Sequence, residues 1–274
     1  MSSLAEARAA ALAREEARTA SRLAHETARA RDWQRPRRST SELQELAEQG
    51  ARLLGGSGIG AHDEASFDEV IAWVADTFGY RAGVACSMAD AVLPHTVASQ
   101  LPWVDVLFLE TGYHFAETIG TRDIVATTME VTIRDIQSEQ SVAQQDAEYG
   151  KDLFARDPAL CCQLRKVVPL TKALAPYEVW FTGVRRDEAP TRTNTPLVTF
   201  DEKNGLVKVN PLASWSFDEL LGYAAAYQVP INPLLSQGYP SIGCEPCTRK
   251  VAPGEDPRSG RWAGLEKTEC GLHT

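Results

Sequence analysis

The cysteines are the residues of this 274-residue chain whose spacing most directly implies chemistry. Cys161 and Cys162 are adjacent, while Cys244 and Cys247 form a CxxC pair. A CxxC spacing lets two thiolates face one metal ion or cluster from a tight loop, although one such pair also suits a redox dithiol or half of a zinc site. Adjacent cysteine side chains diverge, so both rarely reach one small ion. We therefore expect a [4Fe–4S] cluster, whose metal corners are separated, rather than zinc.

The remaining two cysteines stand apart from these four. Cys86 follows an expected strand in the stretch VACSMAD, where a small buried thiol beneath a loop is the simplest interpretation. Cys270 lies four residues from the end, where chains are usually poorly ordered. A thiol near the chain end is either a solvent-exposed side chain without a function or a reactive group that the protein uses.

Several polar and basic residues follow expected strands and predict an anion site. Ser87 ends the first strand, and Thr111 and Gly112 follow the next. Amides at a helix N-terminus bind anions, and open parallel sheets bind ligands at the carboxyl ends of their strands. Arginines also gather in the stretches 184–192 and 258–261. Arginine pairs often only face solvent, but at strand ends beside cysteines they favour recognition of phosphate or sulfate.

The elements that must position these residues alternate between strand and helix. A nearly continuous apolar run, VDVLFLE, is typical of a parallel strand covered on both faces. Residues 41–54 predict a helix capped by Ser41, and Asn204-Gly205 predicts the turn of a hairpin. Residues 89–101 predict a helix in which Pro94 lies in the first turn or causes a kink. Such alternation predicts an α/β fold with a doubly wound, mostly parallel sheet. From residue 229 onward the pattern gives way to Pro, Gly and Cys.

Composition and charge narrow the class of protein. The net charge of −9 argues against a general nucleic-acid binder. Residues 1–40 hold nine arginines against five acids, a charge of +4, which leaves −13 for the rest. No apolar run approaches the roughly 18 residues of a membrane span, and the alternation of charge with alanine at the start excludes a secretory signal. We therefore expect no membrane partner and a cytoplasmic location, where thiols stay reduced.

Seven stretches together carry a resemblance to a known family: ETGYHFAETIGTRD, CCQLRKVVPL, GVRRDEAPTR, KVNPLASW, GYPSIGCEPCT, RSGRW and KTECGLH. They resemble the assimilatory adenylyl-sulfate (APS) reductases of bacteria, in matching order, from about residue 65 to the end. The resemblance implies a fold similar to the PP-loop adenine-nucleotide α-hydrolases. It also implies that Cys161, Cys162, Cys244 and Cys247 bind a [4Fe–4S] cluster, which organises and polarises the site without passing electrons to the substrate.

The same resemblance implies a mechanism. Cys270, in the position of the family's ECGLH cysteine, would attack the sulfate sulfur of APS, leaving an S-sulfocysteine and releasing AMP. Thioredoxin would then liberate sulfite. A flexible C-terminal tail would close over the nucleotide and later swing out to meet thioredoxin. The implied substrate-binding residues are Ser87, Thr111, Gly112, Lys166, Arg185, Arg258, Arg261 and His273.

This interpretation divides the chain into three segments. Residues 1–40 form an Ala/Arg/Glu-rich extension, helical or disordered, without a counterpart in the family. Residues 41–228 are the expected nucleotide-binding α/β domain, and residues 229–274 the cluster-binding and catalytic segment. Two departures stand out: Glu110 replaces the aspartate of the family's Leu-Asp-Thr-Gly, and the loop Ser-Met-Ala-Asp lacks the glycines of the wider PP-loop group. A homo-oligomer is a further expectation.

Other functions remain open at this point. A reductase for the 3′-phosphorylated analogue PAPS, or for both donors, would keep the terminal ECGLH, although relatives specialised for PAPS typically lack the four cluster cysteines. An iron–sulfur sensor that merely binds adenylate would have no need of Cys270. Adenylation or sulfur insertion with ATP would call for the SGGxDS pattern, which the first loop does not have.

Overall fold

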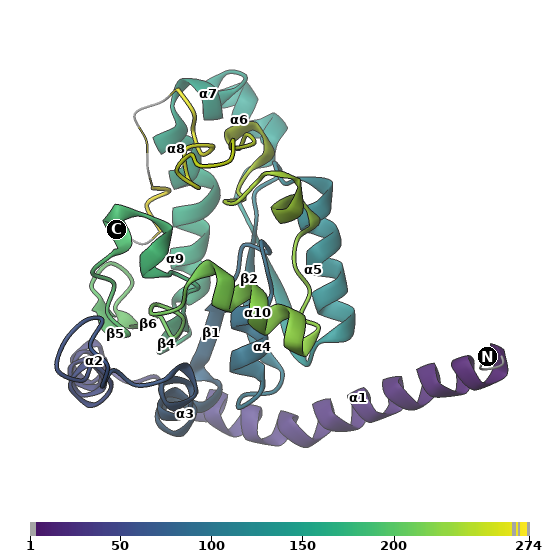
Figure 1. Ribbon diagram of the computed structural model, residues 1–274. Helices are drawn as coiled ribbons and strands as arrows, with labels where there is room; N and C mark the ends of the chain where they lie inside the picture. The colour runs from purple at the N-terminus through teal and green to yellow at the C-terminus, as the bar shows by residue number, and fades with distance from the viewer. Residues whose placement is uncertain (1–3, 265–266, 268, 273–274) are drawn as a thin grey trace.

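A six-stranded sheet forms the centre of the computed structural model, which describes residues 4–264, 267 and 269–272 (Figure 1). Its spatial order is β3-β2-β1-β4-β6-β5. Every neighbouring pair is parallel except β5 and β6, which form the antiparallel hairpin expected around Asn204-Gly205. The prediction of a doubly wound, mostly parallel sheet is confirmed. The strands are β1 (Ala82–Ala85), β2 (Val104–Glu110), β3 (Val131–Gln137), β4 (Val179–Phe181), β5 (Val198–Asp201) and β6 (Leu206–Val209).

The order of the strands creates a switch point between β1 and β4. The chain first winds outward from β1 to β3 through α4 (Val92–Ala98) and α5 (Ala116–Thr128). It then returns past β1 to β4, and Figure 1 shows α9 (Val168–Leu174) across the strands from α4 and α5. Because right-handed crossovers on either side of such a point diverge, a crevice opens at the carboxyl ends of the strands.

The central strands are held by a large apolar core. β1, β2 and β4 are almost entirely buried, and Phe108, Trp180 and Phe181 are among the largest fully buried side chains. The bounds of β2 coincide with the apolar run that predicted it. Pro94 lies in the first turn of α4, where its missing N–H costs no helical hydrogen bond.

Serine caps fix the starts of several helices, among them α2 (Thr40–Leu54), α3 (Phe67–Phe78) and α10 (Phe217–Tyr227). The prediction that Ser41 caps α2 was wrong, because Ser39 does so. The Ser39 hydroxyl accepts from the Glu42 amide, and the Glu42 carboxylate accepts from the Ser39 amide. Ser41 also has a suitable residue, Gln44, three positions later, but the helix begins at Thr40, which places Ser41 inside the first turn.

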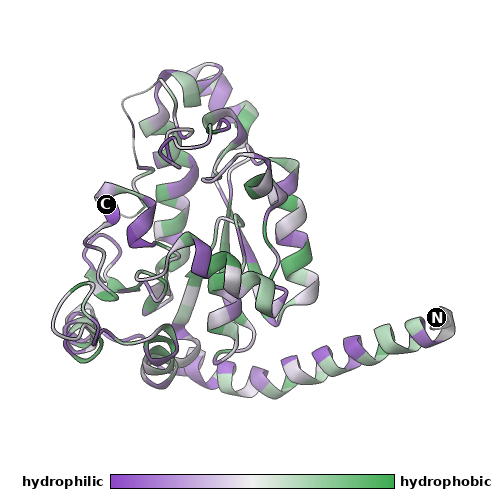
Figure 2. Cartoon of the chain, viewed as in Figure 1, coloured by the Kyte–Doolittle hydropathy of each residue, from purple (hydrophilic) through white to green (hydrophobic). Residues whose placement is uncertain are grey.

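The N-terminal segment forms one long helix, α1 (Leu4–Gln34), that extends beyond the body of the molecule (Figure 1). Figure 2 shows polar and apolar residues interleaved along its length, and residues 6–17 are all exposed. Arg18 donates to main-chain oxygens at the end of α5, at 2.8 Å to Thr127 and 2.6 Å to Ala126. Further along, Arg29 pairs with the buried Asp105 at 2.5 Å.

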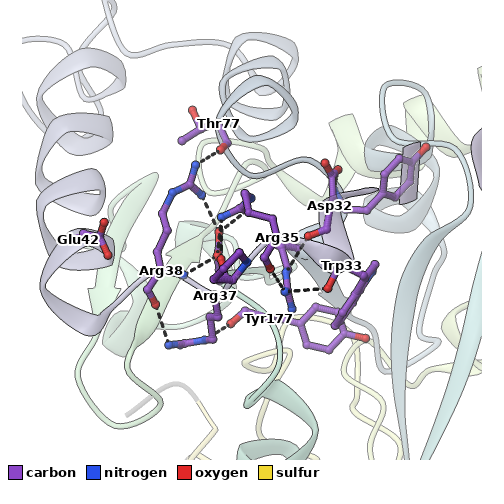
Figure 3. A network of polar contacts seen from close by, with 12 residues as sticks. Asp32, Trp33, Arg35, Arg37, Arg38, Glu42, Thr77 and Tyr177 are labelled. Carbon is purple, nitrogen blue, oxygen red and sulfur yellow. Dashed lines mark hydrogen bonds and ion pairs between the residues drawn. The ribbon is translucent and has the colours of Figure 1, made fainter. Parts of the chain in front are cut away.

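The arginines that follow α1 clasp a fully buried carboxylate at the start of β4. Arg35 binds both oxygens of Glu178, at 2.9 and 2.8 Å, and Arg38 donates to the same carboxylate from its side chain at 2.6 Å and its amide at 2.8 Å. Arg37 binds the neighbouring carbonyl of Tyr177 at 2.9 Å, and Figure 3 shows these side chains converging. The residues 35–38, which we call the arginine clasp, therefore fasten the N-terminal segment to the sheet.

The described part of the C-terminal segment has little regular structure and is held by side chains. The buried Asn232 donates to the carbonyl of Met88 and to the hydroxyl of Thr118, both at 3.1 Å. A second small core of Phe115, Leu234 and Ile242 lies beside it. The segment thereby lies over the carboxyl ends of the strands, near α7 (Leu153–Arg156) and α8 (Pro158–Cys162), at the end of the molecule away from α1 (Figure 1).

Between β3 and α8 the return connection also contains α6 (Val142–Tyr149). Nowhere in the described part of the chain is a helix both long enough and apolar enough to cross a membrane.

Candidate active site

A cavity of about 310 Å³ lies at the switch point of the sheet. Its walls come from the loop after β1, the end of β2, the loop after β4 and the C-terminal segment. Three of these four walls therefore lie at the carboxyl ends of parallel strands, the place where such sheets bind ligands. The volume is at the lower end of the range for sites that enclose a small organic molecule.

The cavity collects most of the residues that the sequence predicted to bind a substrate. They are Ser87, Thr111, Lys166, Arg185, Arg258 and Arg261. Gly112 does not line it: this glycine has a left-handed φ of 75°, and its amide donates to the Glu110 carboxylate at 2.8 Å. His273 lies outside the described residues.

Glu110, the departure from the family pattern, thus has a structural role. Its carboxylate closes the turn at Gly112, and a Cβ on Gly112 would come within 2.8 Å of the Val142 side chain. A carboxylate that is one methylene longer therefore still reaches the backbone of the turn. The turn needs glycine for both its φ and its space.

The basic residues of the cavity are held by specific partners. Arg185 donates to Asp187 at 3.1 Å and stacks on the Phe217 ring at 5.4 Å. Arg261 donates to the carbonyl of Ile242 at 3.2 Å and lies 4.7 Å from the Trp262 ring. Such fixed, planar cations suit the oxygens of phosphate or sulfate.

The four cysteines expected to hold a cluster lie around one small pocket next to this cavity. Cys161, Cys162, Cys244 and Cys247 all line it, and Lys166 and Cys244 line both spaces. All six cysteines of the chain are free thiols. The two cysteine pairs, about 80 residues apart in sequence, are therefore neighbours in space.

The thiols of this pocket influence one another. Burial, and then the neighbouring cysteines, raise the pKa of Cys161 to about 12 and that of Cys247 to about 11. Burial would also raise the pKa of Cys244, but Lys166 and a hydrogen bond with Thr111 outweigh it, so that this pKa is lowered. The Thr111 hydroxyl lies 3.4 Å from the Cys244 sulfur. Four thiolates so placed need a cationic group between them to stay ionised together.

The chemistry of this donor set fits a cluster better than one ion. Among the described residues, no group of three or more cysteine, histidine or acidic side chains has the spacing to hold a single metal ion. The four thiols surround a shared pocket instead of meeting at a point. A polynuclear cluster, which takes four cysteine ligands at separate corners, suits that arrangement.

A π-helical turn follows the adjacent cysteines and was not predicted from the sequence. Residues Gln163–Val167 widen the helical run between α8 and α9. Pro169, two residues later, cannot donate to the carbonyl four residues earlier, and its ring would clash there in a regular helix. The wider turn relieves this conflict, and it carries Arg165 and Lys166 toward the two cavities.

The tail thiol lies in the main cavity. Cys270 is half-buried and lines it together with Leu272, which also packs on the large core. Lys203, from the β5–β6 hairpin, donates to the carbonyl of Gly271 at 3.0 Å. The described part of the tail therefore places a thiol beside the basic residues of the cavity.

The interpretation of Cys86 as a small thiol beneath a loop needs adjustment. Cys86 is only half-buried by its exposed surface, and it lines the main cavity. Its sulfur donates to the carbonyl of Asp90 at 3.3 Å, and burial raises its pKa to about 12. The thiol is therefore held in its protonated form by the loop after β1.

Polar residues in and beside the cavity were not predicted from the sequence. His114 stacks on Phe108, and its Nδ1 is buried without a hydrogen-bond partner. Glu269 binds Arg192 and Arg258. The sequence shows arginines in the stretch 184–192, but it carries no signal that pairs Arg192 with an acid 77 residues away.

Comparison with known proteins gives consistent matches. Residues 79–250 match the model of the phosphoadenosine phosphosulfate reductase domain. The chain is 55% identical over 233 residues to adenosine 5′-phosphosulfate reductase of Mycolicibacterium smegmatis, covering 85% of this chain and 95% of that protein. It is 53% identical over 236 residues to the protein of the same name from Streptomyces coelicolor, covering 86% and 97%.

A solved structure shares the fold. The crystal structure of phosphoadenylyl-sulfate (PAPS) reductase from Candida auris, a phosphate complex, aligns with a TM-score of 0.61 and 26% sequence identity. The alignment covers 76% of this chain and 97% of that one.

Proposed function

We propose that this chain, a member of the phosphoadenosine phosphosulfate reductase family, reduces adenylyl sulfate to sulfite and AMP in sulfate assimilation. The proposal is supported by its similarity to adenosine 5′-phosphosulfate reductases over most of its length. One observation carries the mechanism. Cys270 shares a cavity with Lys166, Arg185 and Arg261, and this cavity adjoins the four-cysteine pocket.

The first step is attack by the Cys270 thiolate on the sulfur of the sulfate group. A sulfur–sulfur bond forms, the bond from sulfur to the phosphate oxygen breaks, and AMP leaves with the electron pair. Since both the nucleophile and the oxygens around that sulfur are negative, the basic side chains lower the repulsion between them. They also favour the ionised form of an approaching thiol.

The second step uses thioredoxin. One of its thiolates attacks the Cys270 sulfur, and sulfite leaves with the electrons of the sulfur–sulfur bond. The second thiol of thioredoxin then frees Cys270, so that a dithiol becomes a disulfide and two electrons reach the substrate sulfur. Thiol chemistry of this kind requires a reducing compartment, and we place it in the cytoplasm. Self-association of the chain stays a prediction.

Cys161, Cys162, Cys244 and Cys247 are the residues that would hold a [4Fe–4S] cluster. When bound, the cluster would fix the four cysteine side chains in place, and its iron would polarise the neighbouring sulfate site. Lys166 links the two spaces because it lines both. We propose that Lys166 orients the sulfate group, while Ser87 and Thr111 contact the nucleotide at the ends of β1 and β2.

The experiment is a single-turnover reaction without reductant. The protein is purified without oxygen, mixed with APS, and its intact mass is recorded with peptide mapping. We expect one added sulfonate on Cys270 and an equal amount of AMP. PAPS run in parallel ranks the two donors, and we expect the slower reaction with PAPS. If the iron-loaded protein gains no adduct on Cys270, the covalent mechanism is wrong.

A further inference from the structure

Glu269, the residue before Cys270, has a carboxylate that several side chains bind. The Glu269 carboxylate binds Arg192 through both oxygens, at 2.9 Å to Nε and 2.8 Å to Nη2. Arg258 donates to it at 3.2 Å, and the Thr191 hydroxyl at 3.3 Å. The two arginines come from separate parts of the chain, one from the loop after β4 and one from the C-terminal segment.

This ion-pair cluster is largely shielded from water. The side chains of Arg192, Arg258 and Glu269 are 12%, 14% and 13% exposed. A bidentate arginine–carboxylate pair fixes orientation as well as charge, and shielding from water strengthens it. Glu188 also pairs with Arg192, so the guanidinium is held in place before the tail arrives. The site is therefore preorganised to take a carboxylate.

The contacts on the other side of Cys270 complete the arrangement. The carbonyl of Gly271 accepts from Lys203, and Leu272 packs on the main core. The thiol is thus fixed from both sides, by a charged contact before it and by polar and apolar contacts after it. Chain ends without such contacts are usually poorly ordered.

We propose that Glu269 is a positioning residue, a latch that binds Arg192 and Arg258 and so holds the Cys270 thiol in the cavity for attack. The proposal rests on the proposed function, because it gives the latch its purpose. It assigns Arg258 to the tail, whereas the family resemblance implies that Arg258 binds the substrate. Lys166, Arg185 and Arg261 then remain for the anionic oxygens of the substrate. Release of the latch would let the sulfonated tail leave for thioredoxin.

The test replaces the charge of the latch with a neutral group of the same shape. Glu269→Gln is compared with Glu255→Gln, an exposed acid in the same C-terminal segment that does not line the cavity. Without APS, iodoacetamide labelling of Cys270 is followed by peptide mapping. We expect labelling to rise about tenfold in Glu269→Gln and to stay unchanged in the control. Glu269→Asp, which keeps the charge, should lie in between.

A second measurement separates the latch from substrate binding. The latch predicts that Glu269→Gln slows S-sulfonation by about tenfold at saturating APS while the affinity for APS stays within about twofold. Arg192→Gln should raise the labelling of Cys270 by a similar factor, and the double variant should add little, because both changes break one contact. Unchanged labelling in Glu269→Gln would overturn the latch. A wild-type protein that APS does not sulfonate would instead overturn the proposed function, and the labelling result would still stand.

Discussion

Four of the six cysteines line the small pocket, whereas Cys86 lines the main cavity. That difference predicts which thiols hold iron. Substituting serine for any one of the four pocket cysteines should lose most of the bound iron and sulfide, because each would supply one corner of the cluster. Iron and acid-labile sulfide per chain, measured on anaerobically purified protein, are the readouts.

The control for this experiment is Cys86→Ser. Its thiol has a raised pKa and bonds to the Asp90 carbonyl, which a serine hydroxyl can also do. We expect this variant to keep its iron. Iron retained after substitution of Cys244, or lost on substitution of Cys86, would contradict the assignment of the four ligands.

At the scale of elements, the arginine clasp joins the N-terminal segment to the start of β4 through the Glu178 carboxylate. Its contribution to the stability of the fold depends on pH, because Glu178 must be ionised. Burial would raise the pKa of Glu178, but hydrogen bonds from Arg35 and Arg38 outweigh it and hold this pKa below its ordinary value. A carboxylate whose pKa is lowered on folding stabilises the protein above its ordinary pKa of about 4.3. That contribution is lost as the pH falls through the lower, folded-state pKa.

Glu178→Gln should therefore lower the free energy of unfolding by about 2 kcal/mol at pH 7, since charged hydrogen bonds are replaced by weaker ones. The difference from wild type should shrink as the pH falls below about 4, toward the folded-state pKa. Urea denaturation at pH 7 and at a series of pH values below about 4 measures it, with the exposed Glu45→Gln on α2 as the matched control. A difference that grows toward acid pH would show that the clasp works in another way.

The elements also show what the sequence can and cannot predict. The apolar run of β2 and the alternation of strand and helix were sufficient to predict a mostly parallel sheet, because a strand buried on both faces must be apolar throughout. The cap of α2 was misplaced by two residues, since Ser39 and Ser41 both have Glu or Gln three residues later, and that spacing alone does not choose between them. The pairing of Glu269 with Arg192 depends on tertiary structure, and spacing along the chain carries no signal for it.

At the scale of the whole molecule, the site and the N-terminal segment occupy opposite ends (Figure 1). The cavity lies at the carboxyl ends of the strands, while α1 and the arginine clasp contact the start of β4, the end of α5 and Asp105 on β2. The two ends are joined through the buried strands. Changes in α1 should therefore act on stability and leave the chemistry at the cavity unaffected.

Two truncations separate the exposed and the anchored parts of α1. Removing residues 1–14 deletes a stretch whose described positions from 6 onward are exposed, so the free energy of unfolding should change by about 0.5 kcal/mol or less. Removing residues 1–34 also deletes Arg18, which donates to carbonyls at the end of α5, and Arg29, which pairs with the buried Asp105. The free energy of unfolding should therefore fall by about 3 kcal/mol or more. Urea denaturation and the rate of S-sulfonation by APS are measured on both. Because α1 is remote from Cys270, folded protein from either truncation should react at the wild-type rate. A reaction slowed by the shorter truncation would instead mean that the exposed half of α1 acts on the cavity.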